Sequence, residues 1–282
     1  MHSEILSSIK MYPTSNLVYS SMSAFAHLGE GELPGSWFVN ALSDLGHSPN
    51  AIRQTLFRLT KQNELVARKS GRQKFYSAST YMVKEISFGL EKIFIAPNQE
   101  WDGLWTMVQY SFEGNERNSR ERLRSILSVL GFAPLGTGLL IHPRDHVDAI
   151  REIVRENDLG ESVRIFRSKQ PDREDDMNLV RALWNLEELA EQYRDFLKQV
   201  EKIEPLLTSL TDQQAFQIRF YVTLEILNIA WNDPDLPASL EPSGWPGNLA
   251  RAAAKRLYEQ LLDPATAYAR GILRNSAHAT QA

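Results

Sequence analysis

The chain has 282 residues, of which 43% are apolar and 23% charged, and its formal net charge at pH 7 is −4. This length accommodates two or three domains with packed cores. The absence of cysteine excludes disulfides, thiolate metal sites and a cysteine nucleophile. No apolar run approaches the roughly 18 residues of a membrane span, and no basic region precedes an apolar stretch at the N-terminus. We therefore expect a cytoplasmic protein.

Two helices are expected within the first 50 residues. Apolar residues at helical spacing predict a helix over 16–27, and the glycines that follow would end it. A second helix is expected from Pro34 to Gly46, with Trp37 and Phe38 on its buried face. Trp37 could anchor an interface, but an aromatic residue at this spacing is better interpreted as core.

Residues 48–78 carry the clearest pattern in the chain. Ser48 can N-cap a helix with proline at its first position, and apolar residues then recur at three- and four-residue steps up to Leu59. After Asn63 the period changes to two, and a turn at Gly71 separates two short runs, which predicts a β-hairpin. Two helices, a short turn, a third helix and a hairpin form the order of a winged helix-turn-helix.

Positive charge is concentrated in this stretch, which contains seven Lys and Arg residues but only one acidic residue, Glu64. Phosphate binding requires such a basic surface. The alternative is a solvated helix followed by an edge hairpin whose lysines discourage aggregation. We favour DNA binding, with the helix reaching base edges or nearby phosphates and the hairpin holding the backbone. The expected DNA contacts are Ser48, Asn50, Arg53, Gln54, Arg58, Lys61, Arg68, Lys69, Arg72 and Lys74.

The next part of the chain alternates between helix and strand. Residues 79–95 predict a connecting helix. The pattern then indicates a strand at 105–110, an arginine-rich helix at 116–130, two short strands around Gly136-Thr137-Gly138, a helix at 144–157 and a strand at 163–167. This order is ferredoxin-like. The polar segment 168–178 is interpreted as a linker.

Beyond residue 178 the periodicity is helical. It predicts one long helix over 178–204, a second over 211–231, and two more over 248–262 and 264–274 after a proline-rich loop. The expected fold class is thus α+β and multidomain. Its expected parts are a winged helix-turn-helix domain at 1–80, a connecting helix at 81–100, a ferredoxin-like domain at 101–170 and an all-helical domain at 171–282.

The chain carries no motif of a catalytic centre. It has no phosphate-binding glycine loop and no Gly-x-Ser-x-Gly elbow. His142 and His146 have a spacing that could hold a metal, but Pro143 lies between them and no third ligand is apparent. The acids at 174–176 are interpreted as a solvated helix start. We therefore expect no enzyme activity, no metal and no cofactor.

Eight motifs, spread over nearly the whole chain, are specific when taken together. They are R-Q-T-L-F-R-L-T-K-Q-N-E-L-V at 53–66, G-R-Q-K-F-Y at 71–76, W-D-G-L-W-T-M-V at 101–108, R-E-R-L-R at 120–124, L-G-F at 130–132, I-H-P-R-D at 141–145, D-P-D-L-P at 233–237 and W-P-G at 245–247. With these motifs the chain resembles the PaaX family of transcriptional repressors, which control aromatic-acid catabolism such as the phenylacetate pathway. Leu139-Leu140 departs from the valine-tryptophan-like pair expected there.

The resemblance implies a winged helix, a middle domain similar to a CRISPR-associated nuclease fold, and a helical C-terminal domain. It also implies a homodimer that binds a palindromic double-stranded DNA operator and is released by an aryl-coenzyme A thioester or a related aromatic metabolite. A nuclease role is disfavoured, because the first strand ends in Gln109-Tyr110-Ser111 without the aspartate that would hold a metal. Two rival functions stay open, a winged-helix protein-interaction or small-molecule-binding module and a metal-dependent nuclease.

The effector pocket is expected where the middle and C-terminal domains meet. Arg120, Arg122 or Arg124 would bind phosphates or a carboxylate there, and Trp184 and Tyr193 would form aromatic walls. In the alternative interpretation, these aromatic residues belong to the core and the arginines form a solvated face.

Overall fold

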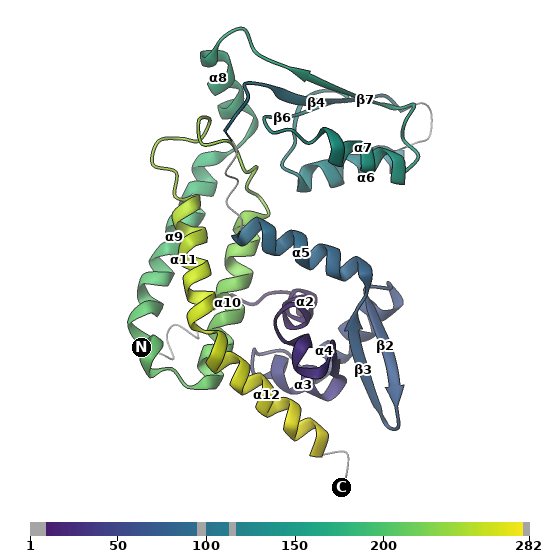
Figure 1. Ribbon diagram of the computed structural model, residues 1–282, viewed down its shortest axis with the longest axis vertical. Helices are drawn as coiled ribbons and strands as arrows, with labels where there is room; N and C mark the ends of the chain where they lie inside the picture. Colours follow the sequence, from purple (N-terminus) through teal and green to yellow (C-terminus); the bar gives the residue numbers. More distant parts are fainter. Residues whose placement is uncertain (1–9, 95–99, 113–116, 279–282) are drawn as a thin grey trace. The chain divides into compact units, whose positions relative to one another are not determined.

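The computed structural model describes residues 10–94, 100–112 and 117–278, and the chain forms two compact units (Figure 1). The first unit comprises Met1–Ile95, Arg194–Asn228 and Asn248–Ala282, and the second comprises Ala96–Tyr193 and Ile229–Gly247. Neither unit is continuous in sequence. The four consecutive domains expected from the sequence therefore differ from these units. The expected helical domain at 171–282 contributes to both, since most of its helices pack with the N-terminal ones.

The first unit begins with short helices and a small antiparallel sheet. Its elements are α2 (Thr14–Phe25), η1 (Ala26–Gly29), β1 (Glu32–Pro34), α3 (Gly35–Ser43), α4 (Pro49–Lys61), β2 (Leu65–Ser70), β3 (Gln73–Ala78) and α5 (Thr80–Phe94). The helices and the hairpin expected here from periodicity are present. Strand β1 is an addition, which pairs with β3 to give the order β1-β3-β2. Three residues that end in proline show no alternation that a sequence pattern could reveal.

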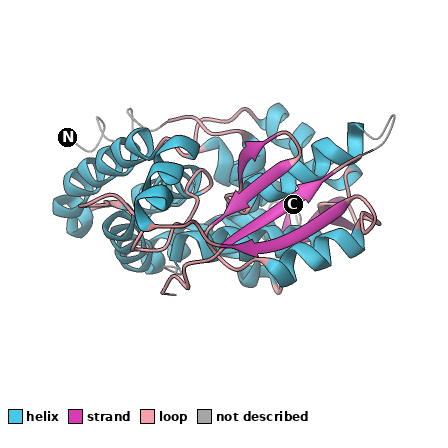
Figure 2. Ribbon diagram, turned by 90° about the horizontal axis from the view of Figure 1, so that it is seen from above, coloured by secondary structure: helices cyan, strands magenta, loops and turns pink. Residues whose placement is uncertain are grey.

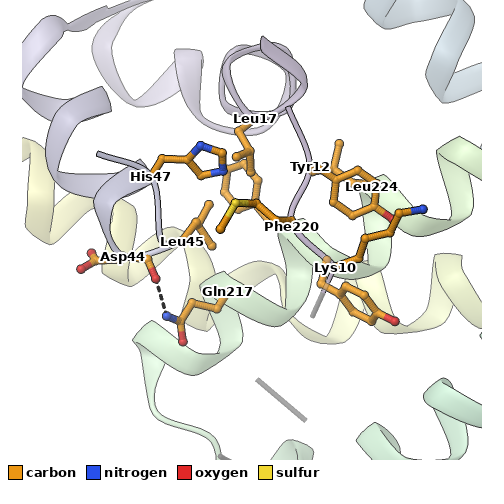
Figure 3. Close-up of a pocket in the computed structure, with 11 residues that line it drawn as sticks. Lys10, Tyr12, Leu17, Asp44, Leu45, His47, Gln217, Phe220 and Leu224 are labelled. Atoms are coloured by element: carbon orange, nitrogen blue, oxygen red, sulfur yellow. Dashed lines mark hydrogen bonds between the residues drawn. The ribbon is translucent and has the colours of Figure 1, made fainter. Parts of the chain in front are cut away.

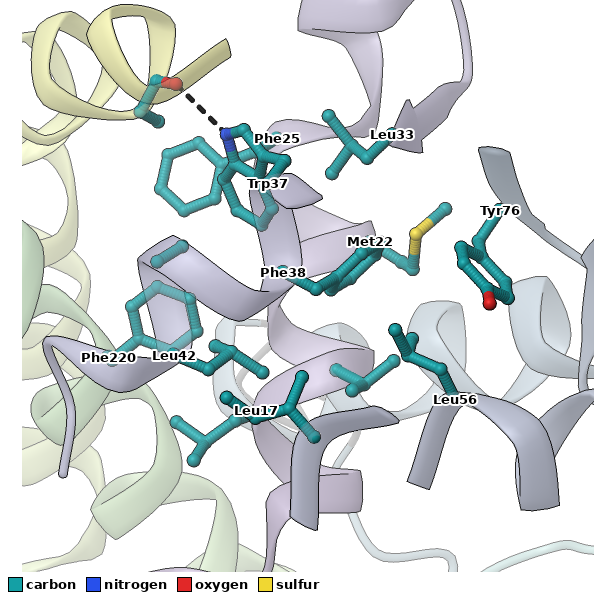
Figure 4. Close-up of a cluster of buried hydrophobic side chains, with 14 of the residues drawn as sticks. Leu17, Met22, Phe25, Leu33, Trp37, Phe38, Leu42, Leu56, Tyr76 and Phe220 are labelled. Carbon is teal, nitrogen blue, oxygen red and sulfur yellow. Dashed lines mark hydrogen bonds between the residues drawn. The ribbon is translucent and has the colours of Figure 1, made fainter. Parts of the chain in front are cut away.

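The core of the first unit joins the N-terminal helices to helices from the far end of the chain (Figure 4). Helices α10 (Asp212–Ala230) and α12 (Leu262–His278) both contribute buried side chains to it. Phe25 stacks on Phe216 of α10, with ring centroids 5.4 Å apart. Trp37 is fully buried and donates a hydrogen bond from Nε1 to the carbonyl oxygen of Ala269 over 3.0 Å. Trp37 is therefore a core residue, as predicted.

A buried arginine also connects distant helices of this unit. Arg219 of α10 is 3% exposed, and its guanidinium carbon lies 5.3 Å from the ring centroid of Phe25 and 4.0 Å from that of Tyr258. Tyr258 belongs to α11 (Gly247–Gln260). Burial lowers the pKa of Arg219, while the Tyr258 hydroxyl favours the charged form. The cation thus holds α2 against α10 and α11.

The helical region departs from the sequence prediction in two places. Helix α8 (Arg173–Leu183) begins inside the expected linker, because Asp172 caps it by accepting a hydrogen bond from the Asp175 N–H over 3.1 Å. The single helix expected over 178–204 is interrupted. Trp184 is extended, and Asn185 accepts a hydrogen bond from the Glu188 N–H at the start of α9 (Leu186–Ile203). A turn of 3₁₀-helix, η2 (Glu204–Ser209), follows α9.

The second unit contains a four-stranded antiparallel sheet. Its elements are β4 (Trp105–Tyr110), α6 (Arg117–Val129), β5 (Ala133–Gly136), β6 (Leu139–His142), α7 (Val147–Glu156) and β7 (Val163–Ser168), and the strands lie in the order β5-β6-β4-β7. Helices α6 and α7 run along one face of the sheet (Figure 1), and strands are coloured magenta in Figure 2. Val108, Leu127 and Ile150 are fully buried between these helices and the sheet. The glycines around Thr137 form the turn between β5 and β6, as predicted.

Helix α8 and the loop over 231–246 pack against the other side of this sheet. Trp105 of β4 is 1% exposed and donates from Nε1 to the Asp176 carboxylate over 2.7 Å. The acids at 174–176 thus start a helix as expected, but Asp176 is buried rather than solvated.

Two motifs of the resemblance meet in this packing. His142 accepts a hydrogen bond at Nδ1 from the Arg144 N–H over 3.1 Å, so Nε2 carries the proton that bonds to the Pro234 carbonyl over 2.7 Å. The Arg144 guanidinium donates to the carbonyls of Asp235 and Leu236. The I-H-P-R-D segment therefore binds the D-P-D-L-P loop and has a structural role.

Candidate nucleic-acid interface

Helix α4 is positioned by its N-cap and by three buried side chains. The Ser48 hydroxyl oxygen accepts a hydrogen bond from the Ala51 N–H over 3.2 Å, and proline fills the first position, where no N–H is needed. Ile52, Leu56 and Leu59 are at most 2% exposed and join the helix to the core shared with α2 and α3. The hydroxyl of Ser48, an expected DNA contact, thus also stabilises the start of the helix.

The opposite face of α4 is exposed and mainly polar. Since residues of an α-helix are spaced by about 100°, the exposed side chains can be ordered around its axis. The exposed residues are Asn50, Gln54, Phe57 and Lys61 along the middle of this face, with Arg53 on one flank and Arg58 on the other. Arg58 also donates to the Gln62 side-chain oxygen over 2.9 Å. Phe57 is not among the contacts expected from sequence, although it lies about 100° off the buried stripe of Ile52, Leu56 and Leu59, and this offset is the signal that indicates its exposure.

The hairpin formed by β2 and β3 carries the other basic residues. Its turn places Gly71 at φ 59°, a conformation that favours glycine, and Arg72 follows at the tip. Lys69 and Lys74 lie directly opposite each other in the strand register, and both are exposed. Among the described residues, Lys69, Arg72 and Lys74 form no ion pair, so their charges are available to an external anion.

Arg68 is held differently from the other cations of the hairpin. Its guanidinium donates two hydrogen bonds to Glu32 of β1, one of them from Nε over 3.0 Å, and it lies 5.0 Å from the ring centroid of Phe75. The hydrogen bond from Arg68 lowers the pKa of Glu32. Part of the charge of Arg68 is therefore compensated within the protein.

The single acid of residues 48–78 is bound on the α2 side. The Tyr19 hydroxyl donates to the Glu64 carboxylate over 2.8 Å, and the Glu64 N–H bonds to the Leu59 carbonyl over 2.9 Å at the end of α4. Burial, followed by the hydrogen bond and charge of Glu64, raises the pKa of Tyr19. The Glu64 carboxylate is thus hydrogen-bonded to the Tyr19 hydroxyl of α2.

The turn between α3 and α4 is bound to helices from the C-terminal part of the chain. The Asp44 carboxylate accepts a hydrogen bond from the Tyr268 hydroxyl over 2.7 Å, and its carbonyl accepts one from Gln217 over 2.6 Å. His47 Nδ1 lies 2.9 Å from the Thr14 hydroxyl oxygen, and burial lowers the pKa of His47. These contacts fix the segment that leads into α4.

A cavity of about 220 Å³ lies beside this turn (Figure 3). Residues of the turn line one side, and α10 lines the other with Gln217, Phe220 and Tyr221. The Lys10 side chain and the Tyr12 ring complete part of the wall. The cavity therefore combines aromatic surface with polar groups, directly at the entry to α4.

The residues expected to bind an effector are divided between different surroundings in the second unit. Arg120 and Arg124 line a cavity of about 640 Å³ together with the β5–β6 turn, whereas Arg122 lies two residues away on another face of α6 and does not line it. The Trp184 indole donates to the Gly131 carbonyl over 3.1 Å, and the buried Tyr193 hydroxyl donates to Asp233 over 2.7 Å. The structure does not bring these two aromatic residues to the arginine cavity.

The histidine pair is close but does not form a larger cluster. The rings of His142 and His146 have centroids 4.6 Å apart. Within residues 10–94, 100–112 and 117–278, no group of three or more His, Asp or Glu side chains is arranged to hold a metal ion. Over the same ranges, no helix is long and apolar enough to cross a membrane.

These features define a class of protein, a mixed α+β multidomain chain that gathers positive charge on one helix and the adjoining hairpin. Residues 98–180 match the family model of the PaaX protein central Cas2-like domain, and residues 184–271 match that of the PaaX-like protein C-terminal domain. The chain belongs to the PaaX family.

Two relatives extend this comparison beyond the family models. The chain is 27% identical over 252 residues to the transcriptional repressor PaaX of Escherichia coli strain K12, which covers 87% of this chain and 79% of the relative. An uncharacterized protein from Mycobacterium tuberculosis has a similar fold, with a TM-score of 0.58 and 20% identity over 93% of this chain and 100% of that one. Family membership supports a role as a transcriptional repressor.

Proposed function

We propose that this protein is a repressor that binds double-stranded DNA through a winged helix-turn-helix formed by α3, α4 and the β2–β3 hairpin. The observation that carries this proposal is the charge of residues 48–78, where seven basic residues lie on α4 and the hairpin while Glu64 binds Tyr19. An α-helix fits the major groove, and an adjacent hairpin can reach the phosphate backbone. Bound DNA would be unavailable to the transcription machinery, so occupancy of a promoter represses it.

We assign different tasks to the exposed residues according to their positions on α4 and the hairpin. Asn50 and Gln54, in the middle of the α4 face, read base edges, while Arg53 and Arg58 on its flanks bind nearby phosphates or bases. The hairpin cations Lys69, Arg72 and Lys74, together with Lys61 at the end of α4, bind the backbone. Arg68 contributes less external charge, because it also pairs with Glu32.

We further propose that a homodimer binds a palindromic operator in genes for the catabolism of aromatic compounds. One helix reads only a few base pairs, and two copies related by a twofold axis double that readout on adjacent half-sites. In the second unit we assign the strand–helix–strand–strand–helix–strand order to a ferredoxin-like domain.

A small aromatic acid or its coenzyme A thioester is proposed to release the protein from DNA. The favoured site is the cavity beside the α3–α4 turn, because Asp44, Leu45 and His47 belong to the segment that positions α4. A ligand that binds better when this segment has moved would lower the affinity for DNA. The cavity with Arg120 and Arg124 is the second candidate, since its cations suit phosphates or a carboxylate.

The DNA-binding proposal is tested by selection of duplexes from a random-sequence library with the full chain. Enrichment of a palindromic sequence is expected. Replacing Arg53 and Gln54 together by alanine should abolish the preference for that sequence, whereas replacing Arg151 and Arg155 on α7, both exposed, should leave it unchanged. Failure to enrich any sequence would overturn the proposal.

The effector proposal is tested on the selected duplex with a panel of aromatic acids and their coenzyme A esters. We expect one compound to release the wild-type protein. Loss of release in Gln217→Leu would place the ligand beside the turn, and loss in the double variant Arg120→Gln and Arg124→Gln would place it in the second unit. Indifference to every compound would refute the effector role and leave DNA binding intact.

A further inference from the structure

Phe57 is an exposed apolar side chain in the middle of the polar face of α4. It is 68% exposed, compared with 51% for Phe166, the other exposed phenylalanine of the described residues. Its neighbours on adjacent turns are Arg53, Gln54 and Lys61, which are also exposed. Among the described residues, no aromatic ring or cation packs against the Phe57 ring. The ring thus faces solvent within a basic surface.

The exposure of Phe57 does not result from a helix that is turned the wrong way. Leu56 and Leu59 are buried on the opposite face. Successive residues are separated by about 100°, so a rotation that buried Phe57 would expose these core leucines. A polar residue at this position would avoid the unfavourable hydration of a phenyl ring. A partner molecule that covered the ring would therefore gain the free energy of removing it from water.

We infer that Phe57 contacts the C5-methyl group of a thymine in the major groove and selects thymine at one position of each operator half-site. This inference rests on the proposed DNA-binding function. The thymine methyl is the apolar group that base edges present in the major groove, and phenylalanine can pack against it. Uracil and cytosine lack this methyl group, so neither offers the contact.

The charges around Phe57 favour DNA over an apolar protein surface as the partner. Arg53 and Arg58 flank the middle of the face, and Lys61 lies one turn beyond Phe57. An apolar partner would bury these cations without compensation, which is costly. In a DNA groove the phosphates compensate the cations while the ring reaches the base edges.

The test replaces each thymine of the selected duplex in turn by uracil, which removes the methyl group and keeps the hydrogen-bonding edge. At one thymine of a half-site, the wild-type protein should bind about fourfold more weakly, as expected for one buried methyl group. Phe57→Ala should bind the unmodified duplex more weakly than the wild type does. Its affinity should be the same whether thymine or uracil occupies that position. Phe166→Ala is the matched control, because Phe166 on β7 is 51% exposed and lies in the second unit.

The outcomes separate this inference from the function on which it rests. Selective binding with no uracil effect in the wild type, or with the same effect in Phe57→Ala, would overturn the thymine contact and leave DNA binding intact. Absence of any sequence-selective, salt-dependent binding would overturn both. Thermal unfolding followed by circular dichroism should show that Phe57→Ala is folded, since the replaced ring makes no core contact.

Discussion

Removal of one hairpin lysine is expected to change stability and DNA binding in opposite directions. Lys69 and Lys74 lie directly opposite each other in β2 and β3, and both are exposed. Like charges at opposed positions of an antiparallel pair repel each other, so Lys69→Gln should raise the free energy of unfolding by about 0.2–0.5 kcal/mol. Glutamine is somewhat shorter than lysine but remains polar, so the loss of the positive charge is the main change.

The same substitution should weaken DNA binding through the loss of phosphate contacts. Each contact contributes about 0.9 to the slope of log affinity against log salt concentration. If each protomer of a dimer loses one contact, the slope should become shallower by about 1.8. The loss should be similar for selected and unrelated duplexes, because a phosphate contact carries no sequence information.

Two measurements on one preparation test this opposition. Urea unfolding followed by circular dichroism gives stability, and fluorescence anisotropy of a labelled selected duplex over a salt series gives the slope. Lys169→Gln, which replaces an exposed lysine of the second unit, serves as the control and should leave the slope unchanged. An unchanged slope in Lys69→Gln would refute the assignment of the hairpin to the DNA backbone. A loss of stability would refute the repulsion between the lysines.

Three further substitutions test the internal packing of the two units. Gly131→Ala should destabilise the protein by about 2 kcal/mol, because Gly131 has φ 87° and an added Cβ would lie 2.9 Å from Pro234 Cα; an unfolding free energy equal to wild type would contradict this. Burial lowers the pKa of His47 from its ordinary value of 6.5, so between the lowered pKa and 6.5 the unfolded chain binds a proton that the folded chain does not. Stability should then fall with falling pH, and less steeply in His47→Gln, whereas equal slopes in urea unfolding would exclude this role. Trp37→Phe removes the bond to the Ala269 carbonyl and part of a buried ring, which should cost about 1–3 kcal/mol in thermal unfolding; a Tm unchanged from wild type would show that this contact does not stabilise the core.

Local patterns predicted the elements of the interface because those elements are determined locally. The Ser48 cap, the buried stripe of α4 and the change to a period of two at the hairpin are all readable over a few residues. The same stripe leaves Phe57 on the exposed side, so its exposure also follows from local spacing. Its contribution to the interface was missed because the basic and polar residues alone were taken as contacts.

Long-range packing accounts for most of what sequence reasoning missed. The Trp37 indole bonds to the Ala269 carbonyl, more than 200 residues along the chain, and no local pattern relates these two positions. The sequence therefore predicted consecutive domains, whereas the chain forms discontinuous units. Likewise, Trp184 and Tyr193 are recognisable as aromatic residues at helical spacing, but their hydrogen bonds to Gly131 and Asp233 depend on the tertiary structure. The short strand β1 exists only because β3 lies beside it.

The central claim is that α4 and the β2–β3 hairpin form a sequence-specific DNA-binding surface. Its most direct test is the affinity of the full chain for the selected duplex and for a shuffled duplex of equal composition, each measured across a salt series. The account predicts an affinity for the selected duplex that is at least about 10³-fold higher, with both affinities falling steeply as salt increases. Equal affinity for the two duplexes, or binding that does not respond to salt, would contradict it.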